Sequence, residues 1–144
     1  RVGAVFTNLN HLVRNSVDHG IELPEQRGKK PACGRITVAC RENQDDWILE
    51  VADDGCGIDV DAVGAAAVAG GRLSATTLQA MSRDERLRLI FLDGVTTRES
   101  ATQDSGRGVG TTALRDSLEA AHGKVDIVTV PGEGTRITVR IPRH

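Results

Sequence analysis

Two short glycine-rich motifs constrain what this chain can fold into more than any other feature of its sequence. Asp53-x-Gly55-x-Gly57 follows a segment with strand-like alternation, and Gly106-x-Gly108-x-Gly110 precedes a segment with helical spacing. Glycine has no Cβ atom and lets the backbone approach a ligand closely. The chain has 16 glycines among its 144 residues, more than the roughly 7% of an average protein. We therefore expect the backbone itself to contact a ligand at these two places.

The length and charge of the chain limit its organisation and its partners. With 144 residues and 15.3 kDa, it fits a single domain over residues 1–144. Its 18 basic and 20 acidic residues give a net charge of -2, which disfavours a nucleic-acid-binding surface. No apolar stretch resembles a membrane span or a signal peptide, so we expect no direct membrane insertion. Three cysteines without a C-x-x-C pair favour a reducing cytoplasm over a disulfide framework or a zinc site.

Hydrophobic periodicity predicts helices alternating with paired strands. The expected elements are a helix over 1–20 ended by Gly20, strands over 35–41 and 47–52, a short helix capped by Asp59 that stops at Gly70, a helix around 83–90, a helix over 111–122 ended by Gly123, and strands over 125–130 and 136–141. Turn residues at 43–46 and 131–134 favour two hairpins. This order predicts an α+β fold, with helices on one face of a mostly antiparallel sheet.

One face of the first helix carries five polar side chains. His11, Arg14, Asn15, Asp18 and His19 lie at helical spacing opposite the apolar residues, and none of them is Lys or Glu. An imidazole and an amide one turn apart can bind a divalent cation that already carries phosphate oxygens and waters. By itself, the pattern also fits an ordinary solvated face.

Each glycine motif has a ligand interpretation and a structural one. An aspartate at the end of a strand can accept a hydrogen bond from an exocyclic amine, while the glycines admit a flat ring, but it can also be a turn residue. Free amides at a helix start favour phosphate, although a glycine loop can be purely structural. The second motif follows no strand and lacks the Lys-Ser/Thr of a P-loop, which disfavours the Rossmann and P-loop folds.

Taken together and in this order, the motifs resemble those of the Bergerat-fold ATPases, which include gyrase-type topoisomerases, the ninety-kilodalton chaperones, sensor histidine kinases and mismatch-repair ATPases. His11-x-x-Arg14-Asn15-x-x-Asp18-His19-Gly20 is similar to the N box, and residues 53–59, 89–97 and 105–110 are similar to the first glycine box, the F box and the second glycine box. R-N-x-x-D-H-G followed by I-E-x-P-E-x-R, with S-G-R-G-V-G, resembles CheA, the chemotaxis-type histidine kinases. The resemblance implies a two-layer α/β sandwich with a mixed, mostly antiparallel sheet.

The resemblance also implies a cofactor pair, ATP and Mg2+, and a role for each motif. Asn15 and His11 would hold Mg2+. Arg14, Asp18 and His19 would lie beside the phosphates. The catalytic group would consist of His11, Arg14, Asn15 and His19. Asp53 would accept the adenine amine, Gly55, Gly57 and Ile58 would border the base, and Thr135 would support it. Residues 92–107 would form an ATP lid, and the phosphates would lie against Ser105, Gly106, Arg107, Gly108, Val109 and Gly110.

One position separates phosphotransfer from hydrolysis within the superfamily. His11 stands where the hydrolysing members carry a Glu that activates water as a general base. The resemblance therefore implies transfer of the γ-phosphoryl group to a histidine. Two alternatives stay open. One is a nucleotide-sensing or protein-binding module without phosphotransfer, which is left possible by Thr111-Thr112, where CheA proteins usually have Met-Asp; the other is a hydrolysing ATPase.

The expected partners lie outside this sequence. Residue 1 is not Met and falls inside a helical pattern, so we expect an excised piece of a larger kinase. His122 and His144 lack the acidic helical surroundings of a phospho-acceptor. The resemblance implies a separate histidine phosphotransfer domain, a dimerisation domain and a response regulator. The chain alone is then expected to be monomeric, in the cytoplasm, and without nucleic acid.

Overall fold

The structure, a computed structural model, describes residues 2–91 and 109–143. In chain order its elements are α1 (Val2–Asn15), a π-helical turn (Ser16–Gly20), a 3-10 turn (Pro24–Gln26), β1 (Ile36–Glu42), β2 (Asp46–Asp53), α2 (Val60–Ala69), α3 (Ala75–Ala80), α4 (Arg83–Leu87), a second 3-10 turn (Arg88–Phe91), α5 (Val109–Ala120), β3 (Lys124–Val130) and β4 (Gly134–Pro142). The predicted α+β class is confirmed. Of the expected helices and strands all are present, and α3 is additional.

The four described strands form one sheet in the order β1-β2-β4-β3, and every pairing in it is antiparallel. Both predicted hairpins are present. Asn43 closes the first, since its side-chain oxygen accepts the backbone N–H groups of Asp45 and Asp46 at 2.8 and 2.7 Å. The second turns through Gly132, whose φ of 79° is a conformation that suits glycine.

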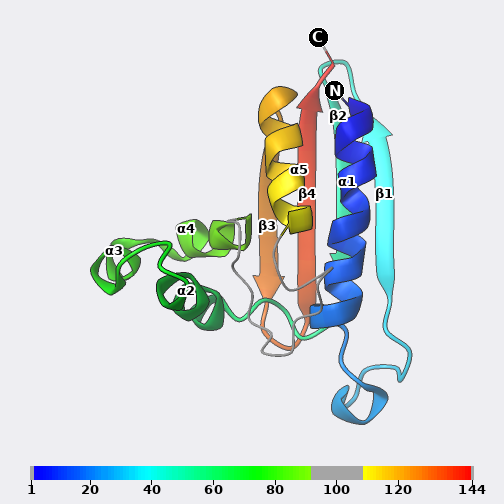
Figure 1. The fold of residues 1–144 in the computed structure, drawn as a ribbon. Helices are drawn as coiled ribbons and strands as arrows, with labels where there is room; N and C mark the ends of the chain where they lie inside the picture. The colour runs from blue at the N-terminus through cyan, green and yellow to red at the C-terminus, as the bar shows by residue number, and fades with distance from the viewer. Residues whose placement is uncertain (1, 92–108, 144) are drawn as a thin grey trace.

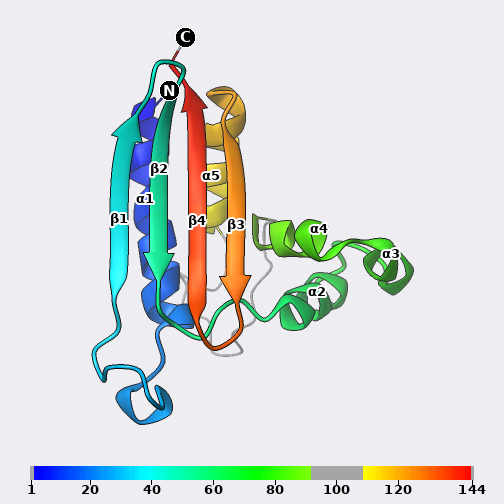
Figure 2. The same cartoon turned by 180° about the vertical axis from the view of Figure 1, so that it is seen from behind.

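Helices α1 and α5 cover one face of this sheet, as Figure 1 shows. In the view from behind, the opposite face carries none of the described helices (Figure 2). Helices α2, α3 and α4 lie beyond the β3 edge in both views, so the expected packing of helices on one face applies to α1 and α5. None of the described helices is long and apolar enough to cross a membrane.

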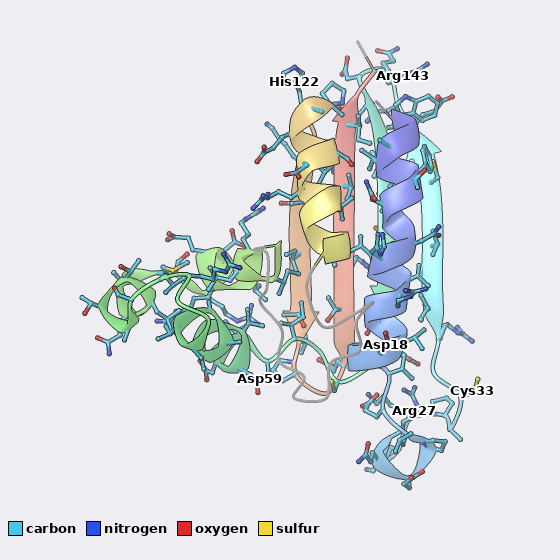
Figure 3. The ribbon with its side chains drawn as sticks, in the orientation of Figure 1. Asp18, Arg27, Cys33, Asp59, His122 and Arg143 are labelled. Atoms are coloured by element: carbon cyan, nitrogen blue, oxygen red, sulfur yellow. The ribbon has the colours of Figure 1, made fainter. Side chains whose placement is uncertain are left out.

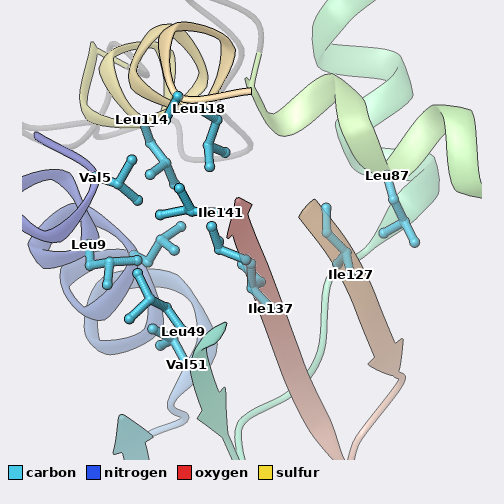
Figure 4. Packing of buried hydrophobic residues seen from close by; sticks show 13 residues of the cluster. Val5, Leu9, Leu49, Val51, Leu87, Leu114, Leu118, Ile127, Ile137 and Ile141 are labelled. Atoms are coloured by element: carbon cyan, nitrogen blue, oxygen red, sulfur yellow. The ribbon is translucent and has the colours of Figure 1, made fainter. Parts of the chain in front are cut away.

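The main core lies between these two helices and the sheet (Figure 4). Val5, Leu9 and Leu12 repeat at helical spacing on α1 and are at most 6% exposed. They pack with Leu114 and Leu118 of α5 and with alternate residues of the strands, which include Leu49, Val51, Ile137, Val139 and Ile141. A smaller cluster of Val63, Ala67 and Leu89 joins α2 to the turn after α4.

The ends of two helices differ from the sequence expectation. The helix predicted over 1–20 is α-helical only to Asn15 and continues to Gly20 with π winding, closed by the Ile21 N–H on the Ser16 carbonyl at 2.8 Å. After α5 the left-handed residue is His122, with φ of 55°, and not Gly123. Position 123 is closely surrounded, since a Cβ there would lie 2.8 Å from Leu118 Cδ2 and 3.2 Å from the Arg140 carbonyl oxygen.

Candidate functional site

Three of the predicted site residues, Asp18, Asp53 and Thr135, lie near one end of the sheet. The π-helical turn after α1, the last residue of β2 and the β3-β4 turn all lie at the lower end of the molecule in Figure 1. Figure 3 shows Asp18, Arg27 and Asp59 at this end, with His122 and Arg143 at the opposite one. The antiparallel order of β2, β4 and β3 produces this convergence, because β2 ends where β4 begins.

Asp53, the last residue of β2, has a carboxylate that is fixed on both oxygens. Oδ2 accepts the Ser16 hydroxyl at 2.9 Å, and Oδ1 accepts the Gly55 backbone N–H at 3.0 Å. A Cβ at Gly20 would lie 3.3 Å from Oδ2, so the end of the π-helical turn rests against the carboxylate. The half-buried Asp53 therefore has one orientation and keeps free lone pairs for a further donor.

Sequence reasoning missed Ser16. It is the first residue of the π-helical turn, and the candidate residues around it carry a charge, an imidazole or an amide. A serine next to an asparagine does not by itself predict a functional role. The contact of Ser16 with Asp53 depends on how the end of α1 packs against the end of β2.

The glycines of the first motif lie against the protein's own backbone. A Cβ at Gly55 would lie 2.1 Å from the Gly20 carbonyl, and one at Gly57 would lie 2.7 Å from the Val130 carbonyl. Gly57 also has a φ of 81°. Gly134 is equally close to the motif, since its Cβ would lie 2.0 Å from the Asp53 carbonyl. These glycines bring the π-helical turn, the motif and the β3-β4 turn into direct contact.

Thr135 lies directly opposite Asp53 in the pairing of β2 with β4. Its hydroxyl is 3.0 Å from the hydroxyl of Thr129. Thr129 is 4% exposed, accepts the Ile58 backbone N–H at 2.8 Å and can donate to the Gly134 carbonyl at 3.3 Å. Thr129 was also missed from the sequence, where it lies between two valines near the end of a strand. Its position on the buried side of the alternating pattern, two residues after Ile127, was the available signal.

The remaining predicted residues are described to different extents. His11 and Asp18 are half-buried and Arg14 is exposed, while Asn15 ends α1 and His19 lies in the π-helical turn. Val109 and Gly110 are the first two residues of α5. Ser105, Gly106, Arg107 and Gly108 lie outside the described residues, together with the expected lid over 92–107.

The donor set can be tested against the expected Mg2+. Among the described residues, no three His, Cys, Asp or Glu side chains form a metal-binding group. Magnesium usually takes only one or two protein groups and completes its shell with waters and substrate phosphates. The described residues therefore form no closed protein cage, and a cation bound here would have to take most of its ligands from phosphate and water.

A network of ion pairs under the first glycine motif was not expected from the sequence. Arg27, which is 2% exposed, contacts Glu22 at 3.1 Å and Asp54 at 2.9 Å. Glu22 also contacts Lys30 Nζ at 2.5 Å, and this hydrogen bond holds the pKa of Glu22 below its usual value. The pKa of Asp54 is also lowered, chiefly by the hydrogen bond from the Arg35 backbone N–H and to a smaller extent by the Arg27 side chain. The segment 21–34 was predicted to be a charged loop. Through Arg27 and Lys30 it is bound to Asp54 and Gly55 of the first glycine motif.

Comparison with known proteins places this arrangement in a family. Residues 4–144 match the family described as histidine kinase-, DNA gyrase B-, and HSP90-like ATPase. Over 144 residues the chain is 40% identical to the gliding motility regulatory protein of Myxococcus xanthus, covering 99% of this chain and 18% of that protein. It is 39% identical over 137 residues to the chemotaxis protein CheA of Halobacterium salinarum, covering 93% of this chain and 20% of that protein. The chain thus spans about a fifth of the length of these relatives.

A solved structure shows the same fold at low sequence identity. The histidine kinase domain from the Erythrobacter litoralis EL346 blue-light activated histidine kinase superposes with a TM-score of 0.53. The match covers 97% of this chain and 46% of that one, at 13% identity. It supports the arrangement of helices and strands described above.

Proposed function

Since the chain belongs to the histidine kinase-, DNA gyrase B- and HSP90-like ATPase family, we propose that it binds ATP with Mg2+ and supplies the γ-phosphoryl group to a histidine on a separate phosphotransfer domain. The setting would be a two-component signalling protein similar to CheA. The observation that carries the proposal is the fixed carboxylate of Asp53 opposite Thr135.

The base would be recognised by Asp53. Two hydrogen bonds orient its carboxylate, and each oxygen keeps a lone pair for the adenine amine. Thr135 would support the base from β4, and Ile58, packed against both hydrophobic clusters, would border it. An ionised carboxylate only accepts hydrogen bonds, so it favours the 6-amine of adenine, which donates, over the 6-carbonyl of guanine, which does not.

The phosphates would lie at the start of α5. Residues 105–110 end in the first turn of this helix, where free backbone N–H groups and the helix dipole favour anions. Asn15 and His11 would hold Mg2+, which would neutralise charge on the phosphate oxygens. Arg14, Asp18 and His19 would lie beside the phosphates, and residues 92–107 would close over them.

The chemical step would need little covalent chemistry from this chain. A nitrogen of the acceptor imidazole would form the N–P bond while the bond from the γ-phosphorus to the bridging oxygen breaks, and ADP leaves with that electron pair. The chain would supply positioning and electrostatic stabilisation. Because the half-buried His11 stands one turn before Asn15, no carboxylate occupies the place of a hydrolytic general base.

The acceptor domain, a dimerisation domain and a response regulator would belong to the longer protein. In this proposal the chain alone is a cytoplasmic monomer that binds no nucleic acid. A module that binds nucleotide without phosphotransfer is the second candidate, on the basis of Thr111-Thr112 after the second glycine motif.

Calorimetric titration of the chain with Mg-ATP tests the nucleotide site. A saturable signal with one nucleotide per chain is expected, and a flat titration would refute the proposal. Radiolabelled ATP with a cognate phosphotransfer domain then separates the candidates. Acid-labile label on that domain supports the kinase, whereas binding without transfer supports the module, and steady release of phosphate by the chain alone supports hydrolysis.

A further inference from the structure

The ammonium group of Lys30 lies among four oxygen atoms from three separate segments. Nζ is 2.5 Å from Glu22 Oε2 and 3.0 Å from each of the backbone carbonyls of Asp54, Gly55 and Gly132. Asp54 and Gly55 belong to the first glycine motif, and Gly132 belongs to the β3-β4 turn. A lysine side chain offers three N–H donors, so this environment uses the whole donor capacity of the group.

From this geometry we propose that Lys30 is a positioning residue for the adenine site: it holds the peptide that orients Asp53 and ties that peptide to the turn before Thr135. The inference rests on the proposed function, because it concerns the same site. Lys30 would not touch the nucleotide. It would act through Asp53, whose carboxylate is the proposed partner of the adenine amine.

The link from Lys30 to Asp53 runs through one planar peptide unit. The Asp54 carbonyl and the Gly55 N–H belong to the same peptide group, which is rigid and trans. Lys30 binds its oxygen at 3.0 Å, while its N–H donates to Asp53 Oδ1 at 3.0 Å. Rotation of this peptide would break both contacts together, so fixing the carbonyl also fixes the donor that orients the carboxylate.

The next peptide unit is fixed in the same way. Lys30 binds the Gly55 carbonyl, and the N–H of the same unit, that of Cys56, donates to the Gly20 carbonyl at 2.8 Å. On the other side, the Gly132 N–H donates to the Cys56 carbonyl at 2.8 Å. Two consecutive peptides of the motif are thus oriented by one cation and joined to the turn that leads into β4.

A cation is the group that suits this position. Three carbonyl oxygens converge on one point, where their negative ends repel one another unless a positive charge lies between them. Glu22 holds the ammonium there, and Arg27 holds Glu22 at 3.1 Å. The Lys30 side chain is 24% exposed, so without it the carbonyls would turn towards water and release the motif.

The test compares Lys30→Met with Lys29→Met, which removes the same charge from the exposed neighbouring residue. Each variant is titrated with Mg-ATP and Mg-GTP at a temperature where circular dichroism shows it to be folded. Lys30→Met should weaken ATP binding about tenfold and reduce the preference for ATP over GTP, because loss of a charge-assisted hydrogen-bond network costs about that factor. Lys29→Met should match the original chain.

The outcomes separate this inference from the proposed function. If the original chain does not bind ATP, the proposed function fails. If the original chain binds ATP and folded Lys30→Met keeps the same affinity and base preference, Lys30 serves stability alone and the inference is overturned. Should Lys30→Met not fold, Glu22→Gln removes the charge that holds the ammonium while keeping the shape of the side chain. An unchanged ATP affinity and base preference in that variant would equally overturn the inference.

Discussion

Asp53 and Thr135 are direct partners across the antiparallel pair of β2 and β4. Residues in this relationship project from the same face of a sheet, about 5 Å apart at their Cβ atoms. The carboxylate that ends β2 and the hydroxyl that begins β4 are therefore placed to serve one ligand. Their separation along the chain hides this relationship, which exists because β4 returns beside β2 and not beside β1.

Removing the Asp53 carboxylate should abolish base recognition. Asp53→Ala is expected to weaken Mg-ATP binding by about 10-fold to 100-fold, the range that follows from loss of a hydrogen bond to a charged group. Calorimetric titration measures the effect, with Asp126→Ala on the exposed part of β3 as a control that should bind normally. If folded Asp53→Ala kept its affinity for Mg-ATP, the base would have to bind at another part of the chain.

If Asn15 is a ligand of Mg2+, its substitution should affect ATP binding differently with and without the metal. Asn15→Ala should weaken ATP binding in the presence of Mg2+ more than in the presence of EDTA, because the amide would contact the cation and not the base. Asn10→Ala changes an exposed amide of the same helix and should leave both affinities unaltered. Equal losses with and without Mg2+ would show that Asn15 is not a metal ligand.

The buried Thr129 is expected to affect both stability and ATP binding, although it is not one of the proposed ligand-binding residues. Thr129→Val keeps the shape of the side chain but leaves the Ile58 N–H without its acceptor and Thr135 without its hydroxyl partner. Such a loss at a buried position should lower the free energy of unfolding by about 1 to 3 kcal/mol and weaken ATP binding several-fold. Urea denaturation and titration measure the two effects, and Thr37→Val on the exposed edge strand β1 should change neither.

The ion pairs of Glu22 and Asp54 predict how stability depends on pH. Both carboxyls have pKa values lowered in the folded chain, Glu22 chiefly by Lys30 and Asp54 chiefly by the Arg35 N–H. A lowered folded-state pKa contributes stability that is present above the unfolded-state pKa, near 4, and is lost as pH falls through the folded-state pKa. The free energy of unfolding should therefore fall on acidification below about pH 4.5. Glu22→Gln combined with Asp54→Asn should flatten this decline, and an unchanged acid profile would contradict the assignment.

The sequence predicted the elements better than their junctions. Alternating residues in β2 and helical spacing in α1 are local signals, and the Pro131-Gly132 turn marks its hairpin directly. The π winding that begins at Ser16 depends on how the helix meets β2, and no local signal encodes it. The resemblance to known motifs supplied Asp53 and Thr135 as candidates. Ser16, Thr129 and Lys30 were missed because each acts on other protein groups, through contacts that only the folded chain brings together.

Two glycines with similar positive φ angles allow the cost of backbone strain to be measured separately from the cost of close contact. Gly57 and Gly71 have φ values of 81° and 73°, so alanine at either should cost about 1 kcal/mol for the left-handed conformation alone. A Cβ at Gly71 would meet nothing within 4 Å, whereas one at Gly57 would lie 2.7 Å from the Val130 carbonyl and 3.1 Å from Thr129 Oγ1. Gly57→Ala should therefore lower the free energy of unfolding clearly more than Gly71→Ala, and only Gly57→Ala should weaken ATP binding, because it displaces the hydroxyl that contacts Thr135. Urea denaturation with parallel ATP titration measures both, and equal losses of stability in the two variants would mean that the first glycine motif does not depend on close contact with the β3-β4 turn.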